Sequence, residues 1–207
     1  MYSLLQPFTE PQIGIVAGEV KLLPCRTLIE EYCGRNHFLS QTETLKHQFA
    51  PYAQTANLAI RREALKEIGL FRSYLATGED TDLCWRMGRQ TSYKMAFVKE
   101  AYVWHPASST LKELRKKFYG YGIGDKMLSR IYNTDLVHYF GPIVILRSLL
   151  GWMLKEFPLS GLLCLFGKRG LVDLLNTPIR LALCQARAKG AKETQWNERV
   201  GKIEKLI

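Results

Sequence analysis

The stretch from Gly78 to Arg86, Gly-Glu-Asp-Thr-Asp-Leu-Cys-Trp-Arg, places the strongest constraint on how this chain folds. Three carboxylates fall within four positions, and an apolar, helix-compatible run follows them directly. Acidic side chains in the first turn of a helix are stabilised by the positive end of the helix dipole. The pattern therefore predicts that a helix begins here. By itself it is also typical of a capped surface helix without a chemical role.

The spacing of the three carboxylates separates one of them from the other two. Glu79 and Asp82 are three positions apart and are expected to share a helix face, whereas Asp80 points elsewhere, toward Leu83 and Cys84. Apolar neighbours disfavour the charged form of a carboxylate and raise its pKa. Such a group suits a general base that works near neutral pH. Asp80 is therefore the first candidate for a catalytic residue.

Four further sequence blocks accompany this stretch. They are Thr55–Arg62, Ile68–Phe71, Tyr102–His105 and Leu114–Gly122. In order and spacing, the five blocks together resemble the acceptor half of family 2 glycosyltransferases. The resemblance implies an α/β fold, namely the C-terminal half of a GT-A (Rossmann-like) glycosyltransferase domain.

The resemblance also implies an inverting transfer of a sugar from a nucleotide sugar. The catalytic base of the family corresponds to Asp80, which would take the proton of an acceptor hydroxyl while that oxygen attacks the anomeric carbon opposite the leaving phosphate. Glu79 would orient the base or bind the acceptor. The predicted substrate-binding residues are Asn57, Asp82, Arg86 and Arg115. Asn57 is equally typical of a side chain that forms hydrogen bonds at a turn or a strand end.

A metal site follows from the resemblance only under a condition. In many relatives a His at the position of His105 completes the coordination of a divalent metal (Mn or Mg) or contacts the diphosphate, although a lone His at a strand end is often structural. The family binds the metal and the nucleotide sugar through an Asp-x-Asp motif that precedes the strand at Ile13, and the printed sequence starts at Met1. We therefore expect either a fragment or truncated gene product, or a separate chain that carries the nucleotide-binding half.

The net charge of +10 is unevenly distributed. Residues 1–111 carry 12 Lys and Arg against 11 Asp and Glu, whereas residues 112–207 carry 17 against 8, a net charge of +9. Anionic lipid headgroups, nucleic acid and pyrophosphate-bearing substrates all fit such a basic half. Because the basic and aromatic block Leu111–Arg130 follows His105 at the spacing of the family, we prefer the diphosphate interpretation for Arg115. A nucleic-acid-binding module remains a third hypothesis that rests on charge alone.

The C-terminal third contains short apolar runs. Leu136–Leu146 and Phe157–Gly167 are each eleven residues without Asp, Glu, Lys or Arg, and Lys168 and Arg169 follow the second run. Both are shorter than the roughly 20 residues that span a bilayer. Residues 136–190 are therefore expected to lie on a membrane surface, on its cytoplasmic face, with Trp152, Phe157 and Phe166 at headgroup depth. The alternative is an ordinary helical hairpin packed on the rest of the chain.

The remaining pattern predicts a partial catalytic domain over residues 1–130 and a basic helical region over residues 131–207. Expected strands are Ile13–Gly18, Gln54–Ile60, Tyr93–Val98 and Ala101–Trp104. Expected helices are Cys25–Gln48, Arg62–Ile68, Leu111–Arg130 and Leu171–Ala188, the last broken at Pro178, with a mobile tail from Gly190. The runner-up function is a non-catalytic peripheral membrane or interaction protein that retains a glycosyltransferase remnant.

Overall fold

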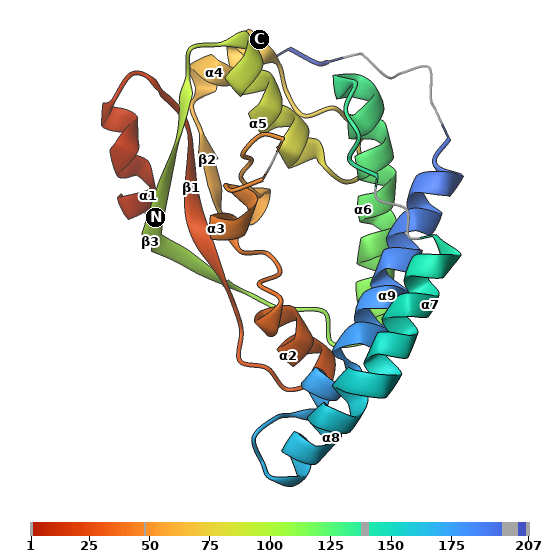
Figure 1. The fold of residues 1–207 in the computed structure, drawn as a ribbon. Coiled ribbons are helices and arrows are strands. Elements are labelled where there is room, and N and C mark those ends of the chain that lie inside the picture. The colour runs from red at the N-terminus through yellow and green to blue at the C-terminus, as the bar shows by residue number, and fades with distance from the viewer. Residues whose placement is uncertain (1, 48, 138–140, 196–202, 206–207) are drawn as a thin grey trace. The chain divides into compact units, whose positions relative to one another are not determined.

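The computed structural model describes residues 2–47, 49–137, 141–195 and 203–205 (Figure 1). The chain forms two compact units. The first comprises Met1–Pro24, His37–Pro106 and the described part of Trp196–Ile207, and the second comprises Cys25–Asn36 and Ala107–Gln195. The mixed α/β class agrees with the sequence prediction. The domain division at residue 130 stays a prediction, and α6 (Leu111–Tyr132) runs through that position.

The first unit is built on a three-stranded mixed sheet with the order β2-β1-β3. The strands are β1 (Ile13–Leu22), β2 (Leu58–Ile60) and β3 (Lys94–His105). β1 pairs with β2 in antiparallel register, Val16 opposite Ala59, and with β3 in parallel register, Ala17 opposite Phe97. As expected for a central strand, β1 is buried from Ile13 to Val20.

Two helices cover this sheet with an apolar core. They are α4 (Arg62–Ile68) and α5 (Glu79–Gln90), and both begin where the sequence predicted. The core consists of Ile15, Ala17, Ala53, Ala64, Ile68, Leu83, Cys84 and Met87. Gly69 ends α4 with a φ of 82°, a backbone conformation that favours glycine. Preceding β1 are α1 (Tyr2–Leu5) and a 3-10 helix (Gln6–Thr9).

Three predicted elements of the sheet region differ from the structure. The two strands predicted for Tyr93–Val98 and Ala101–Trp104 form one strand, β3, with a register shift between Gly18 and Val20 of β1. The first half of the predicted strand Gln54–Ile60 is a 3-10 helix, Thr55–Asn57. The single helix predicted for Cys25–Gln48 is replaced by α2 (Leu28–Arg35) and α3 (Gln41–Thr44). His37 and Leu39 have φ values of 53° and 66°, which interrupt a right-handed helix.

The second unit is held together by a close crossing of two long helices, α6 and α9 (Leu171–Glu193). Two glycines make the close approach possible. A Cβ atom on Gly122 would lie 1.9 Å from the carbonyl oxygen of Arg187, and one on Gly190 would lie 2.0 Å from that of Tyr119. The prediction of a mobile tail from Gly190 is therefore wrong at its start, since Gly190 and Ala191 are buried in α9. Much of the remaining predicted tail lies outside the described residues.

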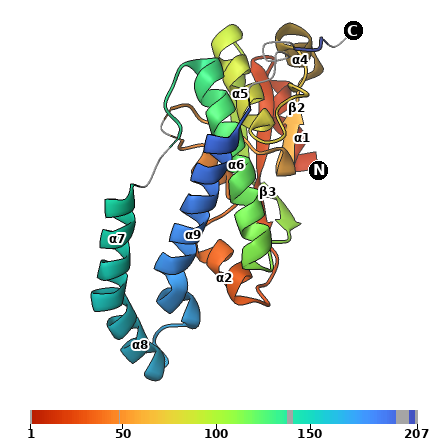
Figure 2. The same cartoon turned by 90° about the vertical axis from the view of Figure 1, so that its right-hand side faces the viewer.

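Residues 142–165, which contain parts of both apolar runs, form a single rod beside α9 (Figure 2). It consists of α7 (Pro142–Gly151), one turn of π-helix (Trp152–Glu156) and α8 (Phe157–Leu165). The predicted break of α9 at Pro178 does not occur. Proline leaves the carbonyl four positions earlier, that of Leu174, without its helical donor. The indole Nε1 of Trp152 donates to this oxygen at 2.8 Å, which satisfies it from the neighbouring helix.

Among the described residues, none of the helices combines the length and the apolar character needed to cross a membrane.

Candidate functional site

The candidate site of the first unit is the N-terminal end of α5. Gly78 precedes the helix with a φ of 80°, in the left-handed region, and this lets the preceding loop turn sharply into the helix. Glu79, Asp80 and Asp82 then occupy the first turn. Their charges are favoured there by the helix dipole, which explains why the helix begins at this point of the sequence.

Asp80 is partly buried, and its two carboxylate oxygens differ in how firmly they are held. Oδ1 accepts hydrogen bonds from the backbone N–H of Thr81 at 2.7 Å and from the Thr81 hydroxyl at 3.3 Å. Within the described part of the chain, the one hydrogen bond to Oδ2 comes from the backbone N–H of Thr55, at 3.4 Å. Burial raises the pKa of Asp80 above its usual value despite these hydrogen bonds, which confirms the direction expected from its apolar neighbours. Its role as a base stays a prediction.

Glu79 lies beside Asp80 and is also only partly exposed. Burial raises its pKa, and the negative charge of Asp80 raises it further. Two adjacent carboxylates with raised pKa values form a pair that holds protons more readily than exposed acids do. This arrangement is compatible with a proton-accepting Asp80 and a neighbouring Glu79 that orients it or binds the acceptor, as the sequence predicts.

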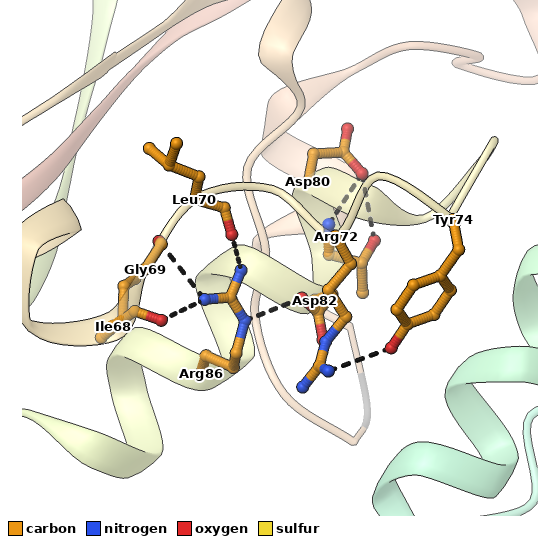
Figure 3. Close-up of polar contacts among 9 residues, drawn as sticks. Ile68, Gly69, Leu70, Arg72, Tyr74, Asp80, Asp82 and Arg86 are labelled. Carbon is orange, nitrogen blue, oxygen red and sulfur yellow. Dashed lines mark hydrogen bonds and ion pairs between the residues drawn. The ribbon is translucent and has the colours of Figure 1, made fainter. Parts of the chain in front are cut away.

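Asp82, by contrast, belongs to a buried ion-pair cluster (Figure 3). Its Oδ2 lies 2.8 Å from Nε of Arg86, one helical turn away, and its Oδ1 lies 2.9 Å from Nε of Arg72. The side chains of Asp82 and Arg86 are 0% and 1% exposed, so neither is open to a substrate in this structure. Substrate binding by these two residues stays a prediction, and the geometry gives them a structural role.

The guanidinium of Arg86 also fixes the chain that leads into α5. It donates to the carbonyl oxygens of Ile68 at 2.6 Å and Leu70 at 2.8 Å, at the end of α4 (Figure 3). Asp80 points away from this cluster toward its own contacts with Thr81. The buried cluster therefore determines where the loop and the first turn of α5 lie, and Asp80 is presented by that first turn.

Arg72, whose side chain is 8% exposed, is not among the site residues predicted from the sequence. Its Nη1 donates to the hydroxyl of Tyr74 at 3.0 Å, while its Nε binds Asp82. The sequence contained one indication of a further cation. The stretch Gly78–Arg86 has three carboxylates and only one Arg. A buried carboxylate requires a cation, and Arg72 is the next one upstream of this stretch.

Asn57 is the last residue of the 3-10 helix Thr55–Asn57 and directly precedes β2. Its side-chain amide donates to the carbonyl oxygen of Glu19 at 2.9 Å and to that of Ala101 at 2.7 Å. The side chain thereby bridges β1 and β3 where their regular ladder shifts. Of the two interpretations left open by the sequence, the structure shows the strand-end hydrogen bonder. A contact with substrate stays a prediction.

His105 is the last residue of β3 and is partly exposed. Its Nδ1 lies 2.7 Å from the carbonyl oxygen of Pro106, so this nitrogen carries the proton when the ring is neutral and Nε2 is left as the possible ligand. Among the described residues, no three His, Cys, Asp or Glu side chains are grouped so that they could hold a metal ion. These residues by themselves do not fit a divalent metal.

Arg115 is an exposed residue of α6 and belongs to the second unit, whereas the other predicted site residues belong to the first. α6 begins at Leu111, as predicted, and its first turn is capped by the Thr110 hydroxyl, which accepts from the N–H of Glu113 at 3.2 Å. Contact of Arg115 with a diphosphate stays a prediction.

Comparison with known proteins assigns the chain to a family. Residues 25–182 match the family described as "Glycosyl transferase family group 2", a segment that includes every predicted site residue from Asn57 to Arg115. The chain belongs to this family. Membership confirms the resemblance to family 2 glycosyltransferases, and it implies a nucleotide-sugar donor and usually a divalent metal.

Two curated glycosyltransferases are similar to this chain. Both are named "Pre-mycofactocin glycosyltransferase", from Mycobacterium tuberculosis strains CDC 1551 / Oshkosh and ATCC 25618 / H37Rv. Each is 29% identical over 125 residues, which cover 57% of this chain and 26% of the relative. The chain thus spans about a quarter of the length of the curated relatives it matches.

Proposed function

We propose that this glycosyltransferase domain takes part in an inverting transfer of a sugar from a nucleotide sugar to a lipid, polysaccharide or other envelope acceptor. The observation that supports the proposal is the position of Asp80 in the first turn of α5. Its pKa is raised by burial, and its Oδ2 accepts a long hydrogen bond from the backbone N–H of Thr55. A raised pKa brings a carboxylate closer to the range in which a general base is most effective.

In the proposed reaction, Asp80 accepts the proton of an acceptor hydroxyl through Oδ2. The acceptor oxygen forms a bond to the anomeric carbon while the bond from that carbon to the diphosphate oxygen breaks. The nucleoside diphosphate leaves with the electron pair, and the anomeric centre is inverted because attack comes from the opposite side. Asp80 needs no covalent role in this reaction. The buried cluster of Asp82, Arg72 and Arg86 keeps α5 in place and thereby positions the base.

The donor side of the reaction is proposed to require a nucleotide-binding half, supplied by a separate chain or by further sequence. Arg115 and His105 are the residues of this chain proposed for contact with the diphosphate. The described residues form no metal site by themselves.

The test of this proposal is the Asp80→Asn variant, measured in the active form of the protein with its donor-binding half. Turnover should fall by about a hundredfold or more, the usual effect of losing a general base. Affinity for the nucleotide should change little, because Asp80 is assigned to the acceptor side. The exposed Glu67 of α4 provides a control, Glu67→Gln, which removes one negative charge from the same unit. A near-normal transfer rate in Asp80→Asn would overturn the assignment.

We further propose that the second unit lies on the cytoplasmic face of a membrane without spanning it. The α7–α8 rod contacts α9 through Trp152, and also through Glu156, which accepts a hydrogen bond from the Thr177 hydroxyl at 2.6 Å. Its large apolar side chains remain exposed, among them Ile143, Leu146, Met153, Leu154, Phe157, Leu159 and Leu162. A concentration of exposed apolar side chains on one element is typical of an interaction site.

This second proposal is tested by co-sedimentation of the full chain with anionic vesicles. Binding at low salt should weaken only in part at 1 M salt, where the Debye length falls to about 3 Å and surface charges are screened. Replacing both Ile143 and Leu154, which are 71% and 70% exposed, with Ser should make binding fully salt-sensitive. Tyr2→Ser, at an 81% exposed position of the first unit, should have no effect. A chain that stays in the supernatant at low salt would favour a rod that packs on protein instead.

A further inference from the structure

A wide-open surface cavity in the second unit lies where the loop between α8 and α9 meets the end of α2. Its volume is about 580 Å³, and it is lined by Arg35, Gly167, Lys168, Arg169, Gly170 and Asp173. Arg35 comes from a part of the sequence far from the other five residues. The contact is anchored by an ion pair between Nη1 of Arg35 and Oδ2 of Asp173, at 2.6 Å. A folded site, and not merely a basic stretch of sequence, is therefore present here.

The charges of this cavity do not cancel. Arg35 is paired with Asp173 and also with Glu31, whose carboxylate lies 2.6 Å from Nη2. Asp173 additionally accepts from the backbone N–H of Gly170 at 2.9 Å, and its hydrogen bond with Arg35 holds its pKa below the usual value. Both acids are thus engaged by Arg35 or by the backbone.

The other two cations of the cavity, Lys168 and Arg169, have donors left for an anion, although the charge of Arg169 also acts on Asp173 and contributes to its lowered pKa. Lys168 forms no ion pair with any residue in the described part of the chain. Arg169 donates one hydrogen bond, from Nη1 to the Ser160 hydroxyl at 2.9 Å, and a guanidinium has five N–H donors. The exposed side of the cavity therefore presents two positive charges with unused donors.

Exposed apolar side chains border these cations. Leu165 and Phe166 directly precede Gly167 in the sequence and are 85% and 70% exposed, and Leu171 directly follows Gly170 and is 64% exposed. A soluble anion would need only the cations and would gain nothing from such a border. An amphiphile with a phosphate next to acyl chains would use both.

We propose that this cavity binds the phosphate of an anionic phospholipid, with Lys168 and Arg169 as its ligands and Leu165, Phe166 and Leu171 in contact with the acyl region. This inference rests on the proposed membrane contact and assigns it a specific headgroup site. The site would hold the tip of the α8–α9 hairpin at the membrane surface, independently of the chemistry at Asp80.

The experiment compares two double variants of the full chain that remove the same charge. One is Lys168→Gln with Arg169→Gln, inside the cavity, and the other is Lys112→Gln with Lys116→Gln, at exposed positions of α6. Binding is measured to vesicles of phosphatidylcholine with and without phosphatidylglycerol. The cavity variant should lose about thirtyfold in affinity for the anionic vesicles, which corresponds to about 1 kcal/mol for each of two cations. The α6 variant should lose much less.

Two further measurements separate the possible outcomes. Phe166→Ser should release the chain from anionic vesicles at high salt while binding at low salt persists. Inorganic phosphate should compete only weakly, because it lacks the acyl chains. Equal losses in the two double variants would overturn the headgroup site while leaving general membrane attraction intact. Tight phosphate binding that the cavity variant abolishes, without an effect on vesicles, would show a soluble anion as the ligand. A chain that binds no vesicles would overturn the underlying membrane proposal.

Discussion

The indole Nε1 of Trp152 donates a hydrogen bond to the carbonyl oxygen of Leu174 at 2.8 Å, across the interface between the α7–α8 rod and α9. Leu174 is the residue four positions before Pro178, and proline has no N–H with which to bond that oxygen. The tryptophan thus replaces a missing helical donor. The indole N–H is also taken up inside the protein and is not free for a lipid headgroup.

A double-mutant cycle tests this relationship. Trp152→Phe should destabilise the protein by about 1–3 kcal/mol, because it leaves the Leu174 carbonyl without a partner. In a Pro178→Ala background the same change should cost measurably less, since the alanine N–H can bond that oxygen. Denaturant unfolding of the four proteins gives the coupling energy. Trp104→Phe, at a 56% exposed position, is the control for loss of an indole. If Trp152→Phe destabilised the protein equally with and without Pro178→Ala, the indole would not be replacing the donor that the proline lacks.

The Asp80 carboxylate is expected to lower the stability of the protein at neutral pH, although the proposed reaction requires it. Burial raises its pKa above the ordinary value of 3.8, so the folded protein holds this proton more tightly than the unfolded chain. The proton on Asp80 therefore stabilises the folded state. This stabilisation is fully present below pH 3.8, and it is lost as the pH rises through the pKa of Asp80 in the folded protein. Asp80→Asn should be more stable than the parent protein at neutral pH, and the difference should disappear at acidic pH. Urea unfolding as a function of pH measures this, with Glu67→Gln as the control for charge.

Asp82 is expected to act on stability in the opposite direction. Asp82→Asn leaves the guanidinium groups of Arg72 and Arg86 buried without a charged partner, which should cost about 3–5 kcal/mol. Glu79→Gln, in the same helical turn but partly exposed, should cost far less. Both are measured by denaturant unfolding. If Asp82→Asn kept full stability and lost only substrate binding, the substrate-binding role predicted from the sequence would replace the structural one.

The crossing of α6 and α9 predicts opposite effects for glycine substitutions in one unit. Gly122→Ala places a methyl group against the Arg187 backbone carbonyl, so the helices must separate, at a cost of about 1–3 kcal/mol. Gly161→Ala in α8 has nothing within 4 Å of the added Cβ and should stabilise the helix by about 0.5–1 kcal/mol. Thermal melts of the two variants should shift in opposite directions. A neutral Gly122→Ala would show that the crossing is looser than described.

Local patterns in the sequence predicted the elements around the candidate site well. The start of α5 at Glu79 follows from its acidic first turn, and α4 from Arg62 to Ile68 follows from Gly69. The apolar neighbours of Asp80 also predicted the direction of its pKa. These properties depend on residues within a few positions of one another, so the sequence contains their causes.

Pairing between distant residues could not be read from the sequence. The ion pair of Asp82 with Arg72 and the two carbonyl contacts of Asn57 depend on how β1, β3 and the loop before α5 come together. These pairings give Asp82 and Asn57 structural contacts, whereas the family resemblance had suggested substrate binding for Asp82 and had left Asn57 open between substrate binding and a strand-end hydrogen bond.

The sequence by itself determined the glycosyltransferase family, the mixed α/β class, the helix that carries Asp80 and the concentration of positive charge after residue 111. Only the tertiary structure decided which polar groups are used internally and which remain available. A proline predicts a helix break until another element supplies the missing donor, as Trp152 does for Leu174. A buried acid needs a cation, but only packing selects Arg72 for Asp82 and Arg35 for Asp173. The physical reason is that burial makes an unpaired polar group costly, so its partner is chosen by proximity in space and not along the chain.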